Sequence, residues 1–426
     1  MATERRTVVA YEHQRLNLGD ELHLDELRHL ARFHDRTDDR YYDLCADGIK
    51  LKHYVGILSV SSLTIEVLPK ADRMSTHPGA TRWRRALLEM VALSGILRPE
   101  LLDEASQHAD SRGLLYALIS QFIGLAEELL RQGLVKNYRS QKENIPALKG
   151  RLLFARHLAV NLSRADRWYT DHNVYDRNYP LNGVIRTTLD VLDSHCPSSL
   201  RRRLRAVRRE FLDINPFRPD QAFMDLLRYD RRTVRYRVII TLAWLILQNL
   251  GPDLSGGEHL LLAIMFDMNR LFETTVLELL RRESRRNALD IRVLPPRPIS
   301  FWKGASLRSD IVIEKDDRRV VVDTKWKTQR EGSVNEQDLR QVFTYGLYFD
   351  AAKVILLYPR TDNEKAIEAP FETIARYPDL RLSCSLAYAD LVTADGTLSD
   401  QFAPGFIAFA FAGDAMADVP RPAVMR

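Results

Sequence analysis

Residues 310–325 of the chain read DIVIEKDDRRVVVDTK, and this stretch decides the fold of the C-terminal part. Two runs of β-branched residues, at 311–313 and 320–322, are typical of strands, and a polar turn lies between them. If the central Asp-Asp pair forms a two-residue loop, Asp310 lies opposite Asp323. The stretch therefore predicts a β-hairpin with two carboxylates across one ladder.

Side chains alternate between the two faces of a strand, so Asp323 and Lys325 share the face of Asp310. Two carboxylates whose Cβ atoms are about 5 Å apart repel each other unless a cation lies between them, which favours a divalent metal. By composition, an acid two positions before a lysine is expected about 1.6 times, and it occurs once. The hairpin, rather than the triplet, carries the prediction, and a surface hairpin with scattered charges is the alternative.

Length and composition set the class of protein. A chain of 426 residues is expected to form two or three domains, and 45% hydrophobic and 28% charged residues are typical of a soluble globular protein. No apolar run is expected to reach membrane-spanning length, since the run 238–247 is about ten residues long, and the N-terminus has no apolar signal-peptide core. Cys45, Cys196 and Cys384 are too few and too widely spaced for a disulfide framework or a zinc cluster. We expect a protein of the reducing cytoplasm.

The charge pattern is compatible with a polyanionic partner. The formal net charge is +5, and the sequence pI is about 9.0. Arginines gather in three groups: 201–209, 231–237 and 281–286. Solvated helix faces explain each group without any ligand, and contact with nucleic acid is the alternative.

The order of predicted elements indicates an α+β multidomain protein. A small β-rich N-terminal domain, with a hairpin of strands at 54–60 and 63–68, occupies residues 1–78. A mainly helical middle region follows at 79–250, with a connector at 144–151 and an irregular aromatic stretch at 168–180. Glycine-rich and proline-containing sequence at 251–257 marks the start of a C-terminal α/β domain, 251–426.

A carboxylate inside an apolar helix face adds to the hairpin. Asp267 is a good N-cap for a helix from Met268 to about Arg282. Glu273 lies in it, and its neighbours one and two turns on are aliphatic, so the carboxylate projects from the apolar stripe. A desolvated carboxylate needs a cation, a hydrogen-bond donor or a proton. A metal site and a partner arginine, Arg297 or Arg308, are the two explanations.

A capped helix follows the hairpin. The sequence Ser333-Val334-Asn335-Glu336 is a capping box, and the helix is expected to run to about Tyr348. Gln341 and Tyr345 are one turn apart and face the same way, although such a pair is also common at ordinary helix edges. Residues 354–359 then form a buried strand, so the order is helix, hairpin, helix, strand.

This order of elements resembles the PD-(D/E)xK nuclease superfamily and, more closely, the McrC family, the nuclease subunit of McrBC-type modification-dependent restriction systems. The segments that carry the resemblance are 268–273, 307–313, 322–327 and 338–345, with 54–57, 63–70, 148–151 and Asn182 in the N-terminal half. Ser309 replaces the proline that is frequent in the family, at a position that holds no metal. The resemblance implies a restriction-endonuclease-like C-terminal domain.

The resemblance also implies roles for named residues. Asp310 and Asp323 would ligate Mg²⁺ together with the main-chain carbonyl of Thr324, since hard cations prefer oxygen ligands. Lys325 would position or deprotonate the attacking water and stabilise charge on the phosphate. Glu273 would complete the site through the metal or a metal-bound water. The residues implied to orient the site and contact the DNA backbone are Gln341 and Tyr345.

The family further implies a partner. An AAA+ GTPase, McrB, forms a hexameric ring that recognises modified, methylcytosine-type DNA, and the N-terminal half of McrC docks in the ring and stimulates GTP hydrolysis. No GxxxxGK[ST] motif occurs in this chain, so the motor is expected to be another chain. Double-stranded DNA is the expected substrate, and no membrane is involved. Two alternatives are a non-catalytic adaptor or GTPase activator that retains the nuclease fold, and a stand-alone PD-(D/E)xK nuclease of repair or recombination.

Overall fold

The computed structural model describes most of the chain. The described residues are 6–35, 39–60, 63–69, 79–99, 113–247, 250–251, 261–286, 291–294, 298–316, 318–327, 334–361, 364–372 and 382–412. They form two compact units: the first contains 1–58, 62–114 and 265–426, and the second contains 59–61 and 115–264. This division into two units does not test the predicted domain ranges 1–78, 79–250 and 251–426, which remain predictions.

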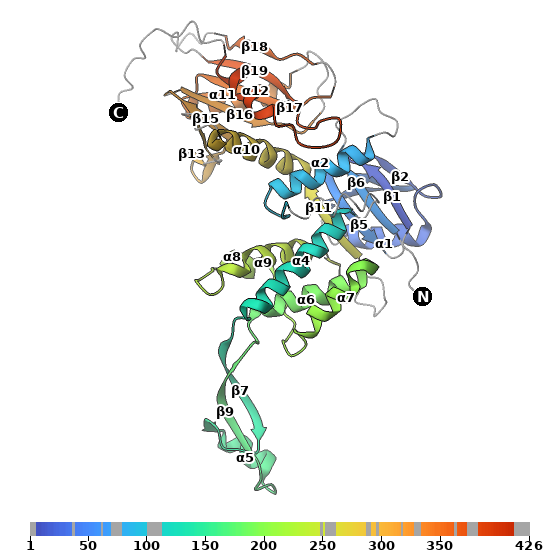
Figure 1. Ribbon diagram of the computed structural model, residues 1–426, viewed down its shortest axis with the longest axis vertical. Coiled ribbons are helices and arrows are strands. Elements are labelled where there is room, and N and C mark those ends of the chain that lie inside the picture. Colours follow the sequence, from blue (N-terminus) through green and yellow to red (C-terminus); the bar gives the residue numbers. More distant parts are fainter. Residues whose placement is uncertain are drawn as a thin grey trace. The chain divides into compact units, whose positions relative to one another are not determined.

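The N-terminal part of the first unit is rich in strands, as the sequence predicts (Figure 1). Its elements are β1 Arg6–Tyr11, β2 Arg15–Asn17, α1 Leu24–His34, β3 Tyr42–Cys45, β4 Gly48–Leu51, β5 Tyr54–Val60, β6 Leu63–Leu68 and α2 Ala80–Leu93. One sheet has the order β1-β6-β5-β11-β10, and a smaller sheet has the order β2-β4-β3. Strands β5 and β6 confirm the predicted hairpin strands; the predicted Ser61-Ser62 turn lies outside the described residues.

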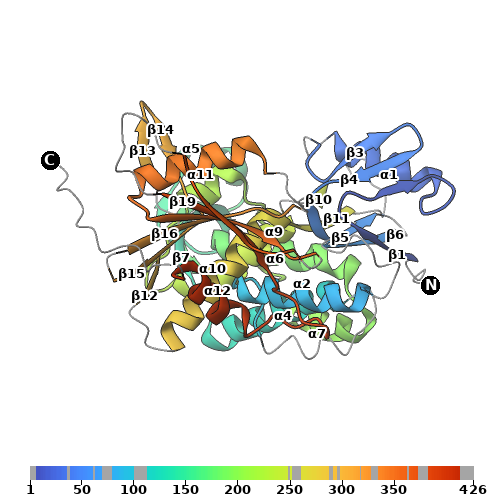
Figure 2. The same cartoon turned by 90° about the horizontal axis from the view of Figure 1, so that it is seen from above.

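A six-stranded sheet with the order β12-β15-β16-β17-β19-β18 organises the C-terminal part. Figure 2 shows helix α11 on one side of this sheet and helices α10 and α12 on the other. The elements of this part are α10 Met268–Arg286, β12 Ile291–Leu294, β13 Ile299–Trp302, β14 Ala305–Leu307, β15 Ile311–Lys315, β16 Arg318–Thr324, α11 Glu336–Tyr348, β17 Lys353–Pro359, β18 Ile367–Pro370, β19 Ser383–Ala389 and α12 Phe402–Ala410. The strands β10 Leu250–Gly251 and β11 Leu261–Asp267 belong to the N-terminal sheet.

The central hairpin has the predicted register. In the β15–β16 ladder Ile311 pairs with Val322 and Lys315 with Arg318, which leaves a two-residue loop. Asp316 has a φ of 46°, a conformation that aspartate tolerates in such turns. The valines and isoleucines of both strands are buried because helices cover both faces of the sheet.

The two helices beside the hairpin also form, with different ends. Asp267 caps α10, because its Oδ1 accepts the Asn269 N–H at 2.9 Å, and the helix continues to Arg286 rather than to Arg282. The N-cap of α11 is Asn335, whose side chain accepts the Gln337 N–H, so the predicted box headed by Ser333 does not describe this helix start. Ser333 itself lies outside the described residues. Strands β12, β13 and β14 lie between α10 and the hairpin and were not predicted.

The second unit combines a helical bundle with a long β-arm. Its helices are α4 Gly113–Gln132, α6 Pro180–His195, α7 Ser198–Arg209, α8 Gln221–Leu226, η1 Val234–Tyr236 and α9 Arg237–Leu247. The arm consists of β7 Asn137–Ile145, β8 Arg151–Leu152, α5 Phe154–Asn161 and β9 Trp168–Asp176. Asn182 holds the base of the bundle: it donates to the carbonyl oxygens of Val135 and Arg177 and accepts from Tyr236 Oη.

The arm corrects one expectation. The aromatic stretch from Trp168 is a regular strand, since β9 pairs antiparallel with all of β7, from Asn137 opposite Asp176 to Ile145 opposite Trp168. Part of the predicted connector at 144–151 also belongs to this sheet. Gly150, with a φ of 71°, permits the close approach, because a Cβ there would lie 2.4 Å from the Asp171 carbonyl oxygen. The strands were missed because β7 buries no side chain and β9 buries only the polar Thr170 and His172, so neither has an apolar alternation.

Helix α4 corrects the expectation that no segment reaches membrane-spanning length. Among the described residues, Gly113–Gln132 alone meets the length and hydropathy of a membrane span, and 72% of its apolar window is buried within the protein. A core helix has the same length and composition.

Candidate active site

Asp310 and the end of β16 meet at the edge of the hairpin. The ladder ends at Ile311 and Val322, one position short of Asp310 and Asp323. Asp310 Oδ2 accepts two hydrogen bonds from Thr324, one from the main-chain N–H at 2.7 Å and one from the hydroxyl at 2.8 Å. The carboxylate of Asp310 is therefore held against the end of the neighbouring strand.

Lys325 connects the hairpin to helix α11. Its Nζ lies 2.8 Å from Asp323 Oδ2 and donates to Gln341 Oε1 at 3.0 Å. Gln341 Nε2 in turn donates to Tyr345 Oη at 2.7 Å. Burial lowers the pKa of Lys325, but Asp323, Asp338 and Asp310 together outweigh burial, and the pKa is raised on balance. The ammonium is therefore fixed in direction and kept charged.

Asp323 is the most buried carboxylate of this group, with 1% of its surface exposed. Burial, followed by the negative charge of Asp310, raises the pKa of Asp323 to about 6, although Lys325 opposes this shift. The contact with Lys325 is an ion pair rather than an aligned hydrogen bond, because Oδ2 has no described donor in hydrogen-bond geometry. The Lys325 ammonium is the cation that this oxygen faces.

Glu273 faces the same carboxylates from helix α10. Burial, followed by the charge of Asp310, raises the pKa of Glu273 to about 7, and Arg308 opposes the shift. Arg308 Nη2 lies 4.0 Å from Glu273 Oε1, and its side chain is 62% exposed, so this arginine neutralises Glu273 only weakly. The other arginine considered, Arg297, lies outside the described residues. Among the described residues, Arg308 is the ion-pair partner of Glu273, and this ion pair is long.

Asp338 is a site residue that the sequence reasoning did not assign. Its Oδ1 lies 3.9 Å from Lys325 Nζ, and its Oδ2 forms an ion pair with Lys327 and accepts from Tyr358 Oη at 3.5 Å. The residue is 8% exposed. The only signal in the sequence was its position three residues before Gln341, and an aspartate in a first helical turn is ordinarily explained by the helix dipole.

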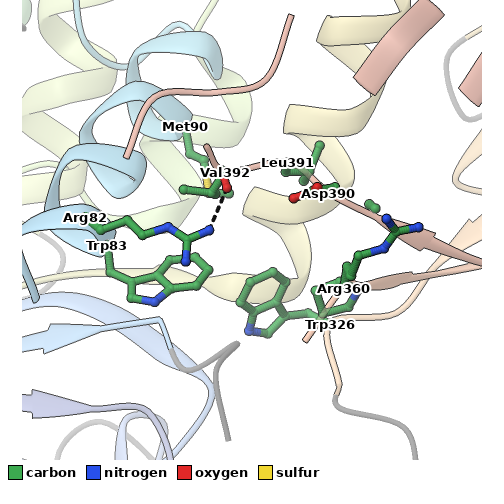
Figure 3. Close-up of a pocket in the computed structure, with 10 residues that line it drawn as sticks. Arg82, Trp83, Met90, Trp326, Arg360, Asp390, Leu391 and Val392 are labelled. Carbon is green, nitrogen blue, oxygen red and sulfur yellow. Dashed lines mark hydrogen bonds between the residues drawn. The ribbon is translucent and has the colours of Figure 1, made fainter. Parts of the chain in front are cut away.

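The residue after Lys325 connects the site to the N-terminal sheet. The Trp326 indole packs against Phe272, with ring centroids 5.2 Å apart, and against Trp83 of α2, at 6.4 Å. Its Nε1–H donates to Glu12, the residue after β1. Figure 3 shows both indoles in a pocket that Arg82 borders, with its guanidinium hydrogen-bonded to the carbonyl oxygen of Val392.

The donor set fits a hard divalent cation that retains water. Mg²⁺ is usually held by one or two carboxylates and several waters. Asp310 and Asp323 supply two carboxylates, and the raised pKa values of Asp323 and Glu273 record negative charge that a cation would relieve. Within the described ranges, no three His, Cys, Asp or Glu side chains gather closely enough to make a complete protein-only metal site. The arrangement fits Mg²⁺ better than zinc.

Six of the fourteen arginines in the three predicted groups form ion pairs within the protein. The ion pairs are Arg203 with Glu127, Arg205 with Asp193, Arg208 with Asp190 and Asp193, Arg232 with Asp230, and Arg281 and Arg285 with Glu278. Internal pairing accounts for these arginines without a nucleic-acid ligand.

Comparisons with known proteins agree on one family. The fold is that of a mixed α+β protein with several sheets, and its candidate site is a carboxylate and lysine cluster at a hairpin edge. A family model described as McrBC 5-methylcytosine restriction system component matches residues 49–359. The chain belongs to this family.

Individual relatives are distant. The type IV methyl-directed restriction enzyme EcoKMcrBC of Escherichia coli K12 is 22% identical over 236 residues, which are 51% of this chain and 67% of the relative. A chain in the assembly of Thermococcus gammatolerans McrB AAA+ hexamers with bound McrC matches with a TM-score of 0.61 at 18% identity, over 95% of this chain and 100% of that chain. The cryo-EM structure of the Thermococcus gammatolerans McrBC complex gives a TM-score of 0.46 at 19% identity, over 65% and 88%. The first structural match establishes the shared fold.

Proposed function

We propose that this chain is the nuclease subunit of a McrBC-like restriction complex and hydrolyses phosphodiester bonds of double-stranded DNA with Mg²⁺. The observation that carries the proposal is the position of Lys325 Nζ, 2.8 Å from Asp323 and 3.0 Å from Gln341, on a hairpin whose other strand starts at Asp310. In this proposal the C-terminal sheet and its helices form a PD-(D/E)xK endonuclease domain. Membership of the restriction family supports it.

The roles of the residues follow from their contacts. Asp310, Asp323 and the Thr324 carbonyl would hold Mg²⁺, and Glu273 would join them directly or through water. When bound, Mg²⁺ offsets negative charge on the phosphate and favours deprotonation of water. Lys325 places a fixed positive charge where negative charge develops, and it orients the attacking water.

Gln341 and Tyr345 act behind Lys325 in this proposal. Gln341 Oε1 accepts a hydrogen bond from the Lys325 ammonium, and Gln341 Nε2 donates one to Tyr345 Oη, so the lysine has few rotamers open to it. Asp338 adds a second acidic group, with Oδ1 3.9 Å from the ammonium nitrogen. These residues keep the lysine directed toward the carboxylates instead of toward solvent.

We also propose that the N-terminal half docks in the ring of a partner AAA+ GTPase and stimulates GTP hydrolysis, while the partner recognises methylcytosine-type DNA in the cytoplasm. The assembly of McrB hexamers with bound McrC supports this partner for a chain of the same fold. The arm of the second unit is a surface suited to docking, since large apolar side chains are exposed along it: Tyr138, Leu148, Phe154, Leu158, Val160, Leu162 and Tyr175.

Cleavage by the full complex tests the catalytic part. The chain, a partner GTPase, GTP, Mg²⁺ and a methylated duplex are mixed, and Lys325→Ala and Asp310→Asn are compared with wild type. We expect cleavage to fall by about 100-fold or more in both variants, while GTPase stimulation stays at the wild-type level. Lys315→Ala, a lysine near the turn of the same hairpin, is the matched control and is expected to cleave normally.

The two alternatives give different results in the same assay. Wild-type cleavage that survives Lys325→Ala would contradict the assignment of the site. GTPase stimulation without any cleavage by wild type would identify a non-catalytic adaptor. Strong cleavage by the chain with Mg²⁺ alone would identify a stand-alone nuclease.

A further inference from the structure

The hairpin that precedes Asp310 has an exposed aromatic tip. Strands β13 and β14 pair Ile299 with Leu307 and Trp302 with Ala305, so the turn consists of Lys303 and Gly304. Gly304 has a φ of 75°, which suits a tight turn. Trp302 is 72% exposed and Phe301 is 48% exposed. Large apolar side chains at a turn that could carry polar ones indicate a contact surface.

The hairpin is anchored to the domain that carries the site. Ile299 and Leu307 pack against the hydrophobic core formed by the sheet and helix α11, which includes Tyr345. Phe301 meets Tyr348 of α11 edge to face, with ring centroids 5.4 Å apart. The tip is therefore held in a defined position.

Both ends of the hairpin border the candidate site. On helix α11, Gln341, Tyr345 and Tyr348 are spaced by four and three residues and lie on one face, so the face that holds Lys325 continues to the Phe301 contact. On the other side, Arg308 follows β14 directly and lies 4.0 Å from Glu273. The hairpin therefore contacts two elements that carry site residues, α11 and the segment that leads to Asp310.

The charged residues around the β13–β14 hairpin indicate which class of ligand binds its tip. Lys303 at the tip and Arg308 at the base are exposed, as is Arg270, which lowers the pKa of Glu273. Aromatic rings among cations suit a ligand that has both phosphates and apolar ring faces. DNA has both, whereas a protein partner would not need cations beside catalytic carboxylates.

We propose that the tip of the β13–β14 hairpin, residues Phe301–Gly304, binds duplex DNA beside the scissile phosphate, with Trp302 against the bases in the minor groove and Lys303 on the backbone. The proposal rests on the proposed nuclease function. An apolar wedge of this kind partly unstacks a base step and bends the duplex. The hairpin would thereby position the phosphate at Asp310 and Asp323.

Binding, rather than cleavage, tests the contact. The full chain, with Ca²⁺ in place of Mg²⁺, is titrated into a fluorescent duplex that contains 2-aminopurine, at several salt concentrations. We expect Trp302→Ala to weaken binding by about 10-fold to 100-fold and to abolish the 2-aminopurine signal of unstacking. Lys303→Ala is expected to reduce the slope of log affinity against log salt by about one unit, and Trp302→Ala to leave that slope unchanged.

Two further variants distinguish the loss of a DNA contact from a general loss of folding. Trp302→Phe keeps an aromatic ring and is expected to bind within about threefold of wild type while losing the tryptophan quenching that DNA causes. Ile367→Ala, an equally apolar and 49% exposed position on β18, is expected to bind as wild type.

The outcomes distinguish this inference from the proposed function. Wild-type affinity and wild-type unstacking in Trp302→Ala overturn the inference, even if the complex cleaves DNA. A Trp302→Ala variant that binds duplex normally but loses GTPase stimulation also overturns the inference, because it assigns the tip to the protein partner. A full chain that binds no duplex overturns it as well. Retained DNA binding through Trp302 with no cleavage by wild type supports the inference and contradicts the nuclease function.

Discussion

The Trp326 indole N–H donates to Glu12 Oε1 at 2.7 Å, across 314 positions of sequence, and both side chains are buried. Trp326 follows Lys325 directly, and its ring packs on Phe272, the residue before Glu273. One hydrogen bond therefore ties the end of strand β1 to the two segments that carry the lysine and the helical carboxylate of the site.

Glu12→Ala tests this connection. The variant leaves a buried indole N–H without its acceptor, at a cost of about 1–3 kcal/mol in the free energy of unfolding. We expect the cleavage rate to fall more than duplex affinity, because Lys325 loses the support of its neighbour. Denaturant unfolding, rates and affinities are measured on the same preparations. Glu12→Gln keeps an acceptor oxygen and is expected to restore activity; equal damage in both variants would contradict a role for the hydrogen bond.

Asp323→Asn is expected to stabilise the metal-free protein at pH 7.5. Because the pKa of Asp323 is raised to about 6, ionisation favours the unfolded chain. The contribution of Asp323 to the free energy of unfolding is complete below about pH 4, where the carboxyl is protonated in both the folded and the unfolded chain. It is lost as the pH rises through about 6. We expect Asp323→Asn to be more stable than wild type at pH 7.5 and to lose this advantage near pH 4, as measured by denaturant unfolding at both pH values.

Mg²⁺ is expected to stabilise wild type more than Asp323→Asn. It should raise the Tm of wild type at pH 7.5 and not that of Asp323→Asn, as measured by thermal unfolding with and without the ion. Asp316→Asn at the turn of the same hairpin is the control, since its backbone conformation suits asparagine. An equal Mg²⁺ shift in wild type and Asp323→Asn would contradict the metal assignment.

Gln341→Ala is expected to slow cleavage by about tenfold with little change in fold stability. The substitution removes the oxygen that accepts from Lys325 Nζ at 3.0 Å and frees the ammonium to rotate. Single-turnover cleavage rates measure the effect. The exposed Gln337, one turn earlier on α11, supplies the control Gln337→Ala; an equal loss in the two variants would mean that helix stability, not lysine orientation, is responsible.

The edge of the C-terminal sheet provides a pH prediction away from the site. Burial alone raises the pKa of Glu368, but the hydrogen bond from the buried Lys353 lowers it on balance. The ion pair therefore adds stability that is complete above the ordinary carboxyl pKa of about 4 and is lost as the pH falls through the lowered value. Glu368→Gln should flatten the acid limb of the stability curve. Glu372→Gln, an exposed carboxylate after the same strand, should leave it unchanged.

The hairpin and its neighbours were predictable because their signals are local. Loop length and side-chain alternation set the register of β15 and β16, and the ladder has the predicted register as far as Ile311 and Val322, next to Asp310 and Asp323. Apolar spacing likewise predicted α10, with Glu273 on the face that turns inward. The start of α11 was misjudged by two residues, since Asn335 caps it in place of Ser333.

Other parts of the site have no local signal. Asp338 acquires its role only when α11 packs on the sheet and brings it to Lys325, Lys327 and Tyr358. The arm strands β7 and β9 pair residues up to 39 positions apart and have no apolar face by which to recognise them.

The sequence by itself determined the hairpin, its register and the three residues at its edge, because a two-residue turn leaves the paired strands only one alternation of faces. Tertiary structure decided which partners these residues have. Gln341 reaches Lys325 from α11, Glu12 reaches Trp326 from β1, and the exposed Trp302 tip stands beside the site. Such contacts depend on the packing of distant elements, in which burial and charge are set by neighbours that no local pattern records.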